Sequence, residues 1–377
     1  MPRPIVAHIS KSALQHNLQV VRDHLGRASP SPDTAPQVWA VIKANAYGHG
    51  IERAVDGLHE ADGLAMLDMD EALRCRMAGW RKPILMLEGF FDESDLALCM
   101  DHGLTVVVHD PDQIRMLQSL RPPSDSPPLK IFLKLNSGMN RLGFDPEHFQ
   151  QAHTMLRSMA QDGKIGDIGT MTHFACADEH GGMDAPLAVF RDATSAMDGP
   201  VSVSNSAAIL ASPALMPSQP GRVSWVRPGI CLYGGSPFAD QEAADFGLLP
   251  AMTLSSRIIG VQSLSPGQSV GYGYRFTADR PMRIGVVACG YADGFPRHAP
   301  NGTPVSVAGC RTRLIGRVSM DMLTVDLSDL PQAGVGSPVV LWGKEGPSVD
   351  EVARASGTIG YELLCAIAQR VRVLSSE

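Results

Sequence analysis

The chain lacks the features of a membrane-bound or nucleic-acid-binding protein. Its 377 residues contain no apolar run long enough to cross a bilayer and no cluster of basic residues, and its formal net charge is −7 at pH 7. A net negative charge disfavours binding to nucleic acid or to an anionic membrane. The segment from Met1 to His8 also lacks the apolar core of a secretory signal. We therefore expect a cytoplasmic protein that binds neither nucleic acid nor membranes.

Cysteine is scarce and scattered. The seven cysteines are odd in number and form no Cys-x-x-Cys pair, which argues against a disulfide framework and against a zinc site. We expect reduced, mostly buried thiols and no metal site. A glycine-rich nucleotide-binding turn is missing too, because no Gly-x-Gly-x-x-Gly segment follows the first predicted strand.

What the chain does contain is a regular alternation of short apolar runs and amphipathic helical patterns. Asp or Pro precedes several of the helical patterns, and both residues suit a helix start. The runs that predict strands are Val38–Ile42, Leu64–Leu67, Ile84–Leu87, Leu104–Val108, Lys130–Leu135, Ile168–His173, Val201–Val203 and Trp225–Leu232. Such a series of βα units is typical of a (β/α)8 TIM-type barrel. The missing glycine-rich turn disfavours a doubly wound open sheet, which is the main alternative.

The pattern changes in the last third of the chain. From Ala251 onward, strand candidates alternate with Pro and Gly turns, and a single short helix is predicted over 349–355. These candidates are Thr253–Val261, Arg283–Ala288, Thr303–Val307, Met322–Val325 and Val339–Leu341. We predict an N-terminal strand over residues 1–10 that packs on the C-terminal domain, an α/β barrel over 11–240, and a mostly antiparallel β domain over 241–377.

The most informative segment runs from Ala40 to Gly50, Ala-Val-Ile-Lys-Ala-Asn-Ala-Tyr-Gly-His-Gly. An apolar strand ends there at Lys43, where the chain continues into small residues and glycine. Most lysines are exposed, but the carboxyl ends of parallel strands are where such folds bind ligands. A desolvated lysine loses basicity and becomes a nucleophile suited to Schiff-base formation. Lys43 is therefore a candidate catalytic residue.

Polar residues follow other predicted strands in the same way. Lys134 and Arg141, His173, Asn205 and Ser206, and Arg227 to Ile230 all lie at or just beyond strand ends. Each has an ordinary explanation by itself, as a surface lysine, a structural histidine or a helix cap. Together they place several cations in one barrel interior, where an unpaired ammonium would be costly. We therefore expect a group that neutralises Lys134.

With these strand ends, the Ala40–Gly50 segment closely resembles the pyridoxal-phosphate lysine segment of alanine racemases. Other similar segments are Lys130–Gly143, Thr172–Asp178, Ser204–Ala208, Val226–Gly234, Ala288–Phe295, Val318–Met322 and Gly360–Glu362. The resemblance covers essentially the whole chain, from Arg3 to about Arg372. It implies an isomerase that interconverts L-alanine and D-alanine, uses pyridoxal 5'-phosphate and is active as a homodimer.

The resemblance also implies roles for single residues. Lys43 would carry the cofactor as a Schiff base, and Arg227 would face its pyridine nitrogen. Because a guanidinium stays protonated, the ring would remain neutral and favour racemisation over transamination. The remaining implied roles are cofactor binding by Tyr47, Arg141, His173, Asn205, Ser206, Gly229, Ile230 and Tyr361, substrate binding by Arg141 and Met320, and support by Asp321 and by Lys134, carbamylated by carbon dioxide. Asn136 and Asn140 replace an aspartate and a glycine of many relatives, and Ser319 replaces a cysteine.

Racemisation requires two acid/base groups, one on each face of a planar intermediate. The resemblance implies Lys43 for one face and Tyr291, from the partner subunit, for the other. His173 and Arg227 would complete a chain that assists the Tyr291 phenol, since phenols titrate near 10 without help. One active site would then take residues from two chains.

Three alternatives remain open from the sequence. A racemase with broader specificity, acting on serine or other small amino acids, would share these motifs, because excluding a methylene is worth only about 1–3 kcal/mol. A noncatalytic pyridoxal-phosphate-binding protein would have no need of residues 251–377. A decarboxylase of basic amino acids would need an acidic partner for the ring nitrogen, where Arg227 stands.

Overall fold

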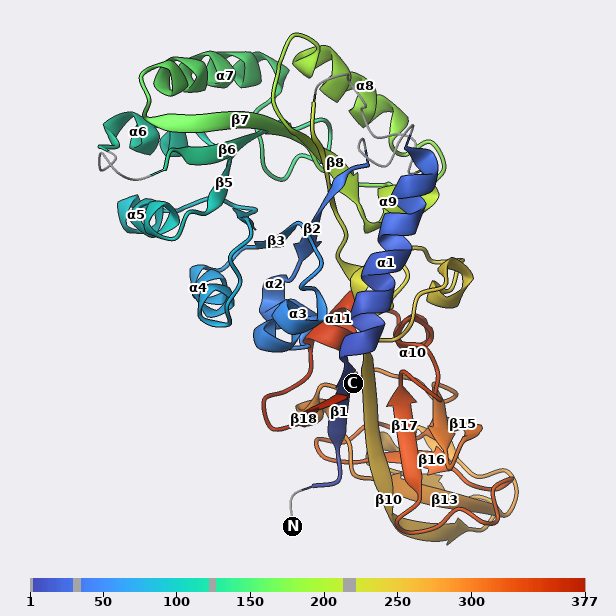
Figure 1. The fold of residues 1–377 in the computed structure, drawn as a ribbon. Helices are drawn as coiled ribbons and strands as arrows, with labels where there is room; N and C mark the ends of the chain where they lie inside the picture. Colours follow the sequence, from blue (N-terminus) through green and yellow to red (C-terminus); the bar gives the residue numbers. More distant parts are fainter. Residues whose placement is uncertain (1–2, 30–34, 122–126, 213–221, 377) are drawn as a thin grey trace. The chain divides into compact units, whose positions relative to one another are not determined.

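The computed structural model describes residues 3–29, 35–121, 127–212 and 222–376, and Figure 1 shows its course. The chain forms two compact units. The barrel unit comprises residues 18–46 and 54–232, and the sheet unit comprises residues 1–17, 47–53 and 233–377. Each unit is therefore built from segments that are separated in sequence.

The barrel unit contains a closed barrel of parallel strands, in the order β2 to β9, which confirms the predicted α/β barrel. Its strands are β2 (Gln37–Val41), β3 (Gly63–Met66), β4 (Ile84–Met86), β5 (Thr105–Val108), β6 (Leu129–Lys134), β7 (Ile165–Met171), β8 (Val201–Asn205) and β9 (Ser224–Arg227). Every residue of β3 and β5 is buried, as expected of parallel strands covered on both faces. The eight apolar runs thus lie on the eight strands of the barrel.

The barrel closes where β9 pairs with β2, with Gln37 opposite Trp225 and Val38 opposite Val226. Beside this closure the rings of Trp39 and Trp225 stack, with their centroids 4.0 Å apart. A Cβ atom at Gly63 would lie 2.2 Å from the Trp39 ring. Only glycine therefore fits on β3 beneath that ring.

Helices follow the barrel strands, and α4 to α7 lie around the outside of the barrel in Figure 1. Asp68, Asp92, Asp110 and Asp145 cap these helices by accepting hydrogen bonds from backbone N–H groups, as the sequence predicts. Each such cap stabilises its helix by about 1 kcal/mol. The helices are α1 (Lys11–Ala28), α2 (Lys43–Tyr47), α3 (Ile51–Gly57), α4 (Met69–Met77), α5 (Glu93–Asp101), α6 (Pro111–Ser119), α7 (Pro146–Gln161), α8 (Asp184–Thr194) and α9 (Ser206–Ala211), and the 3-10 turn η3 (Ile230–Tyr233) follows β9.

The sheet unit is built on an eight-stranded sheet in the order β13-β16-β15-β14-β17-β10-β1-β18. Its pairs are antiparallel except for β1 and β18, which run parallel. The strands are β1 (Val6–Ser10), β10 (Met252–Leu264), β13 (Met282–Val287), β14 (Pro304–Val307), β15 (Cys310–Ile315), β16 (Leu323–Asp326), β17 (Pro338–Trp342) and β18 (Arg372–Ser376), and β11 (Ser269–Val270) pairs with β12 (Phe276–Thr277). The remaining elements are η4 (Ala243–Phe246), η5 (Tyr272–Tyr274), η6 (Tyr291–Asp293), α10 (Val349–Ala355) and α11 (Gly360–Cys365).

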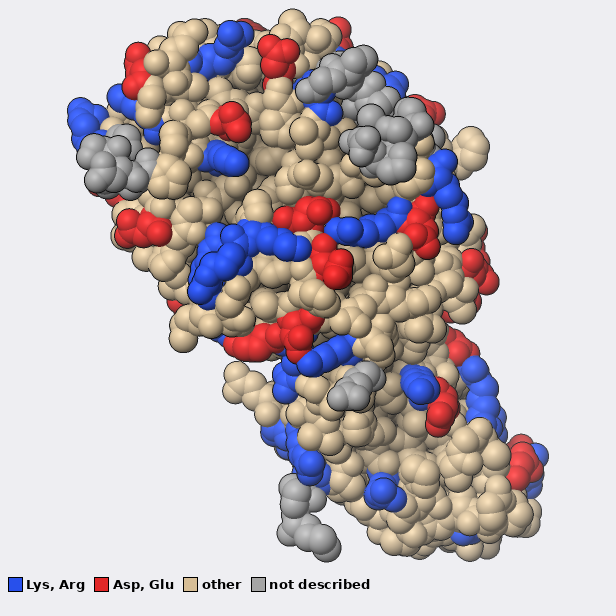
Figure 2. All heavy atoms as spheres, in the orientation of Figure 1, with Lys and Arg blue, Asp and Glu red and all other residues tan. Residues whose placement is uncertain are grey.

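Charges of both signs are interspersed on the face of the molecule drawn in Figure 2. Among the described residues, no helix is both long and apolar enough to cross a membrane. All seven cysteines are free thiols, and four of them, at positions 75, 99, 231 and 289, are buried.

Candidate active site

Four cationic or titratable side chains meet at the carboxyl end of the barrel. Lys43 follows β2, Lys134 is the last residue of β6, His173 follows β7, and Arg227 is the last residue of β9. Parallel strands of a closed barrel end on the same rim, which brings these positions together. Their electrostatic effects on one another confirm the proximity, since Arg227, Lys134 and Lys43 all lower the pKa of His173.

Lys134 is almost completely buried, with 8% of its surface exposed. Burial is the main cause that lowers the pKa of Lys134 to about 8, and the positive charges of Arg227, Arg141 and Lys43 lower it further. The negative charge of Glu88 acts in the opposite direction. An appreciable share of the Lys134 side chains is therefore neutral at slightly alkaline pH. This agrees with the expectation that an unpaired ammonium is unfavourable in the barrel interior.

Arg227 lies at the centre of a hydrogen-bond network. It is 5% exposed, and burial lowers its pKa to about 10, so the guanidinium remains charged at neutral pH. Its Nη2 donates to the Thr172 carbonyl oxygen over 2.7 Å and to the Val203 carbonyl oxygen over 3.2 Å. Its Nη1 donates to the Ser202 hydroxyl. These partners, two on β8 and one directly after β7, fix the direction of the guanidinium group.

The same Nη2 lies 3.3 Å from Nδ1 of His173. Because a guanidinium only donates, Nδ1 must accept, and the proton of the neutral ring must lie on Nε2. Burial, followed by the charge of Arg227, lowers the pKa of His173 to about 2. His173 is therefore a neutral ring of fixed tautomer at physiological pH.

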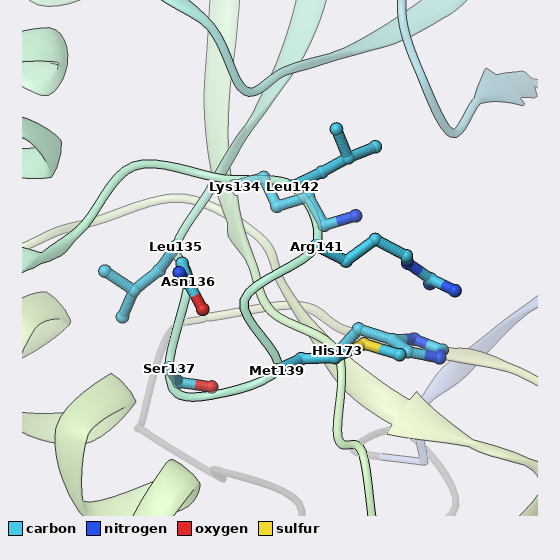
Figure 3. A pocket seen from close by; sticks show the side chains of 8 residues that line it. All are labelled: Lys134, Leu135, Asn136, Ser137, Met139, Arg141, Leu142 and His173. Atoms are coloured by element: carbon cyan, nitrogen blue, oxygen red, sulfur yellow. The ribbon is translucent and has the colours of Figure 1, made fainter.

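Arg141 lies in the loop beyond β6 and lines a pocket together with Lys134 and His173 (Figure 3). Asn136 and Asn140 shape this loop. Oδ1 of Asn136 accepts from the backbone N–H groups of Gly138, over 3.1 Å, and Asn140, over 3.0 Å. Asn140 has a φ of 56°, a left-handed conformation that glycine and asparagine adopt most easily. Asn140 therefore adopts a backbone conformation that otherwise favours glycine.

The backbone after Lys43 has an unusual conformation that the sequence did not indicate. Ala44, Asn45 and Ala46 have φ values of 54°, 52° and 55° with ψ values of 53°, 46° and 52°, which form a left-handed turn. This conformation costs about 1–2 kcal/mol per non-glycine residue. Glu71 supports the turn, because its carboxylate accepts a hydrogen bond from the Asn45 N–H. Burial raises the pKa of Glu71.

A cluster of hydrogen-bonding groups lies between β8 and η3. Ser206, which is 4% exposed, accepts a hydrogen bond from the Gly229 N–H over 2.8 Å. The Cys231 thiol lies 3.3 Å from the same oxygen and donates to it. The Ser206 hydroxyl thus keeps its own proton for donation to a further acceptor. Asn205 orders the neighbouring backbone by capping α9 through the Ala208 N–H.

The barrel-end residues fit pyridoxal phosphate. The lysines and arginines at the carboxyl end of the barrel produce a positive electrostatic potential there. The buried Ser206 hydroxyl has a proton to donate, and it lies beside the backbone of Gly229 and Ile230. A phosphate ester requires both features. Two observations support this fit. The Ser206 hydroxyl and the neighbouring backbone can donate hydrogen bonds to a phosphate, and a bound anion would reduce the repulsion among the cations.

The other implied site residues belong to the sheet unit. The Tyr47 ring stacks on Tyr233 with a centroid separation of 4.6 Å and lies 6.0 Å from the Tyr361 ring. Tyr291 is 38% exposed and begins η6, while Met320 is 53% exposed. The N–H groups of Tyr291 and Ala292 donate to the carbonyl oxygens of Ser319 and Met320, each over 3.0 Å. The structure thus joins the Tyr291 and Met320 loops.

Three residues around these loops were missed by the sequence analysis as site residues. Asp293 is completely buried beneath Tyr291, and Arg3 and Arg370 both form ion pairs with it and with Asp321. Asp293 lies two residues after Tyr291 in the Ala288–Phe295 segment, and this proximity in sequence indicates that it could support Tyr291. Arg3 and Arg370 lie near opposite ends of the sequence, and nothing in their local sequence indicates a shared partner.

Comparisons with known proteins agree with one another. Family models described as the N-terminal and C-terminal domains of alanine racemase match residues 9–237 and 251–374. An alanine racemase of Bordetella petrii is 60% identical over 375 residues, with 99% of both chains covered. Another, from Polaromonas naphthalenivorans, is 53% identical over 379 residues, with 99% of both chains covered. The crystal structure of a biosynthetic alanine racemase from Pseudomonas aeruginosa is similar over 100% of both chains, with a TM-score of 0.90 and 45% identity.

Proposed function

Because this chain belongs to the alanine racemase family, we propose that it interconverts L-alanine and D-alanine with pyridoxal 5'-phosphate as its cofactor. The observation that carries the proposal is the pair formed by the charged, buried Arg227 and the neutral His173, beside Lys43 and Lys134. When bound, the cofactor supplies an aldehyde for amines and a ring that withdraws electrons from Cα of an amino acid. The chain must supply the groups that bind, orient and exchange protons.

Several residues would hold the cofactor. Lys43 would bind its aldehyde carbon through Nζ. Its phosphate would be bound by the Ser206 hydroxyl, the backbone at Gly229 and Ile230, and the Tyr47 phenol. The Ser206 hydroxyl would donate its proton in a hydrogen bond to a phosphate oxygen. Asn205, Tyr361, Arg141 and His173 would complete the binding set.

Arg227 would donate a hydrogen bond to the pyridine nitrogen. A guanidinium cannot accept a proton, so it holds the nitrogen in its unprotonated, accepting form. The network that fixes Arg227 on Thr172, Val203 and Ser202 would keep this donor in place during turnover. Arg227 thereby limits electron withdrawal by the ring and favours rapid return of a proton to Cα.

Lys43 and Tyr291 would exchange protons with Cα on opposite faces. Lys43 Nζ would remove the proton of D-alanine, and the phenol oxygen of Tyr291, contributed by the partner subunit of a homodimer, would remove the proton of L-alanine. Each would return a proton when the other has removed one. Arg141 and the backbone at Met320 would bind the substrate carboxylate.

Lys134 would react with carbon dioxide. Its pKa of about 8 provides a neutral amine, whose nitrogen forms a bond to the carbon of carbon dioxide and releases one proton to solvent. The product is a carbamate with a single negative charge, so a buried cation becomes an anion. That anion would hold Arg141 and offset the positive charge of Arg227.

Incubation of the purified, cofactor-loaded protein with L-alanine in deuterated water tests the proposed function. We expect L-alanine and D-alanine in equal amounts at equilibrium, with deuterium at Cα of both. Serine serves as a second substrate, because a pocket that excludes one extra group discriminates by only about 1–3 kcal/mol. Equal rates with both substrates would favour the broader-specificity racemase, and no exchange at Cα would contradict the proposal. A cytoplasmic location belongs to the same proposal, and cell fractionation would test it.

A further inference from the structure

Two arginines from opposite ends of the sequence bind the loops that carry Tyr291 and Met320. Nε of Arg370 donates to Oδ1 of Asp293, and its Nη2 donates to Oδ1 of Asp321, each over 2.7 Å. Nη2 of Arg3 donates to Oδ2 of Asp293 over 3.2 Å and to the Asp321 carbonyl oxygen over 2.6 Å. Each arginine therefore bridges the same two aspartates.

Asp293 is the buried member of this network. It is 0% exposed, and its Oδ2 also accepts from the Gly290 N–H over 2.9 Å. Burying a carboxylate is strongly unfavourable unless charged or polar donors surround it. Arg3, Arg370 and the Gly290 amide supply those donors, so removing an arginine leaves this carboxylate incompletely bound.

The turn around Asp293 is tied to the loop that contains Met320. Besides the two backbone hydrogen bonds already described, Gly290 packs so closely that a Cβ atom there would lie 2.3 Å from the Ser319 carbonyl oxygen. The pairing of backbone groups joins the two loops at Tyr291, and the arginines join them at Asp293 and Asp321. The two loops therefore form one unit within the sheet unit.

We propose that Arg3 and Arg370 are positioning residues that clamp Asp293 to Asp321 and thereby hold Tyr291 and Met320 in their reactive arrangement. This inference rests on the proposed function, because it takes Tyr291 as one of the two proton-transferring groups. The side chains of both arginines are 40% exposed, whereas Asp293 is fully buried, so loss of an arginine leaves a buried carboxylate with fewer donors. Because all of these contacts fall on Asp293 and Asp321, the two-arginine clamp acts first on the order of the Tyr291 and Met320 loops.

The first experiment measures residue-resolved amide hydrogen exchange on the full-length, cofactor-loaded protein. In Arg3→Ala and Arg370→Ala, the Tyr291 and Ala292 amides should exchange about tenfold faster or more, as expected when a hydrogen bond to a charged group is lost. Arg370→Lys keeps the charge but not the planar donors that bridge two carboxylates, so it should fall between Arg370→Ala and the unmodified protein.

A matched control is available in the same unit. Arg313 forms an ion pair with the mostly buried Asp326 over 3.1 Å, so Arg313→Ala removes a comparable pair elsewhere in the sheet. It should leave exchange at Tyr291 and Ala292 unchanged. Unchanged exchange in both clamp variants, or equally accelerated exchange in the control, would overturn the clamp.

The second experiment separates positioning from a loss of folded protein. With D-alanine in deuterated water, the ratio of deuterium incorporated into recovered D-alanine to L-alanine formed should rise severalfold in the clamp variants. Lys43 would still exchange the Cα proton of D-alanine, while a displaced Tyr291 would complete racemisation less often. A reduced amount of folded protein would lower both quantities equally, so an unchanged ratio with accelerated amide exchange would overturn the positioning role.

The proposed function can fail independently of this inference. An unmodified protein that neither racemises alanine nor exchanges its Cα proton would overturn the proposed function. Amide exchange would still show whether Arg3 and Arg370 order the Tyr291 turn, and unchanged exchange would overturn the clamp as well.

Discussion

His173 accepts a hydrogen bond from Arg227 through Nδ1, over 3.3 Å. The bond places the only ring proton of His173 on Nε2, and burial together with the nearby cations lowers its pKa, so the ring does not bind a second proton at neutral pH. A histidine that stays neutral in the folded protein but titrates normally in the unfolded chain makes stability depend on pH. The contact therefore has a consequence that unfolding experiments can measure.

We predict that His173→Asn reduces the loss of stability in acid. The pKa of His173 is about 2 in the folded protein and about 6.5 in an unfolded chain. Between these values only the unfolded chain binds the proton, so stability falls as the pH drops below about 6.5, by up to about 1.4 kcal/mol per pH unit. Urea unfolding at pH 7.5 and pH 5.5 measures this slope. The exposed-histidine control His59→Gln should retain the slope of the unmodified protein, and an unchanged slope in His173→Asn would contradict the prediction.

Lys43→Ala should abolish both turnover and the visible absorbance of the bound cofactor. No other amine is expected to replace Nζ of Lys43, because Lys134 is proposed to be carbamylated. Lys130→Ala is a suitable control, since Lys130 is an exposed lysine on a barrel strand. Absorption spectra and racemisation rates check the prediction. Retained absorbance in Lys43→Ala, with borohydride trapping the cofactor on another residue, would show that the assignment is wrong.

Lys134 should give a carbamate signal when the protein is incubated with carbon-13-labelled bicarbonate. Burial and neighbouring cations lower its pKa to about 8, so the share of neutral amine rises as the pH increases through that value. Carbon-13 NMR detects the carbamate, which should be absent in Lys134→Ala and present in Lys130→Ala. A spectrum of the unmodified protein without this signal, at saturating bicarbonate, would refute carbamylation.

Mixing two inactive variants should restore activity if the active site is shared. Lys43→Ala and Tyr291→Phe each remove one proposed acid/base group, so a mixed dimer has one site with both lesions and one with neither. Random exchange of subunits in an equal mixture should restore roughly a quarter of the unmodified sites. Recovered racemisation after exchange measures this fraction. If mass spectrometry shows mixed dimers but no activity returns, Tyr291 acts within its own subunit or not at all.

The barrel could be predicted from the sequence because its signals are local. Each strand is a short apolar run ended by polar or small residues, and each of α4 to α7 begins at an aspartate cap. The order of such signals along the chain determines the order of strands around the barrel, since neighbours in sequence pair in space. The β domain was harder to predict. Strand β15 was missed because exposed Arg311 and Arg313 interrupt its apolar pattern.

The site was predictable in chemistry but not in conformation. Motifs identified Lys43, Arg227 and Tyr291, whose roles stay predictions until they are tested. The left-handed turn after Lys43 could not be predicted, because the sequence Ala-Asn-Ala contains no glycine that would indicate positive φ angles. The ion pairs of Arg3 and Arg370 with Asp293 could not be predicted, because ion pairs between residues far apart in sequence produce no local or periodic sequence pattern.

Strand β1 pairs with strands that are translated much later. Val6 lies opposite Ser255 on β10 and opposite Arg372 on β18, so the complete barrel sequence separates β1 from both partners. On the ribosome, β1 emerges before both of its partners and keeps its edges unpaired until they follow, and such edges promote aggregation. The barrel strands, by contrast, mostly pair with their sequence neighbours and can associate as they appear. The yield of folded protein in a recombinant host should therefore depend on chaperones that shield β1 until β18 has left the ribosome.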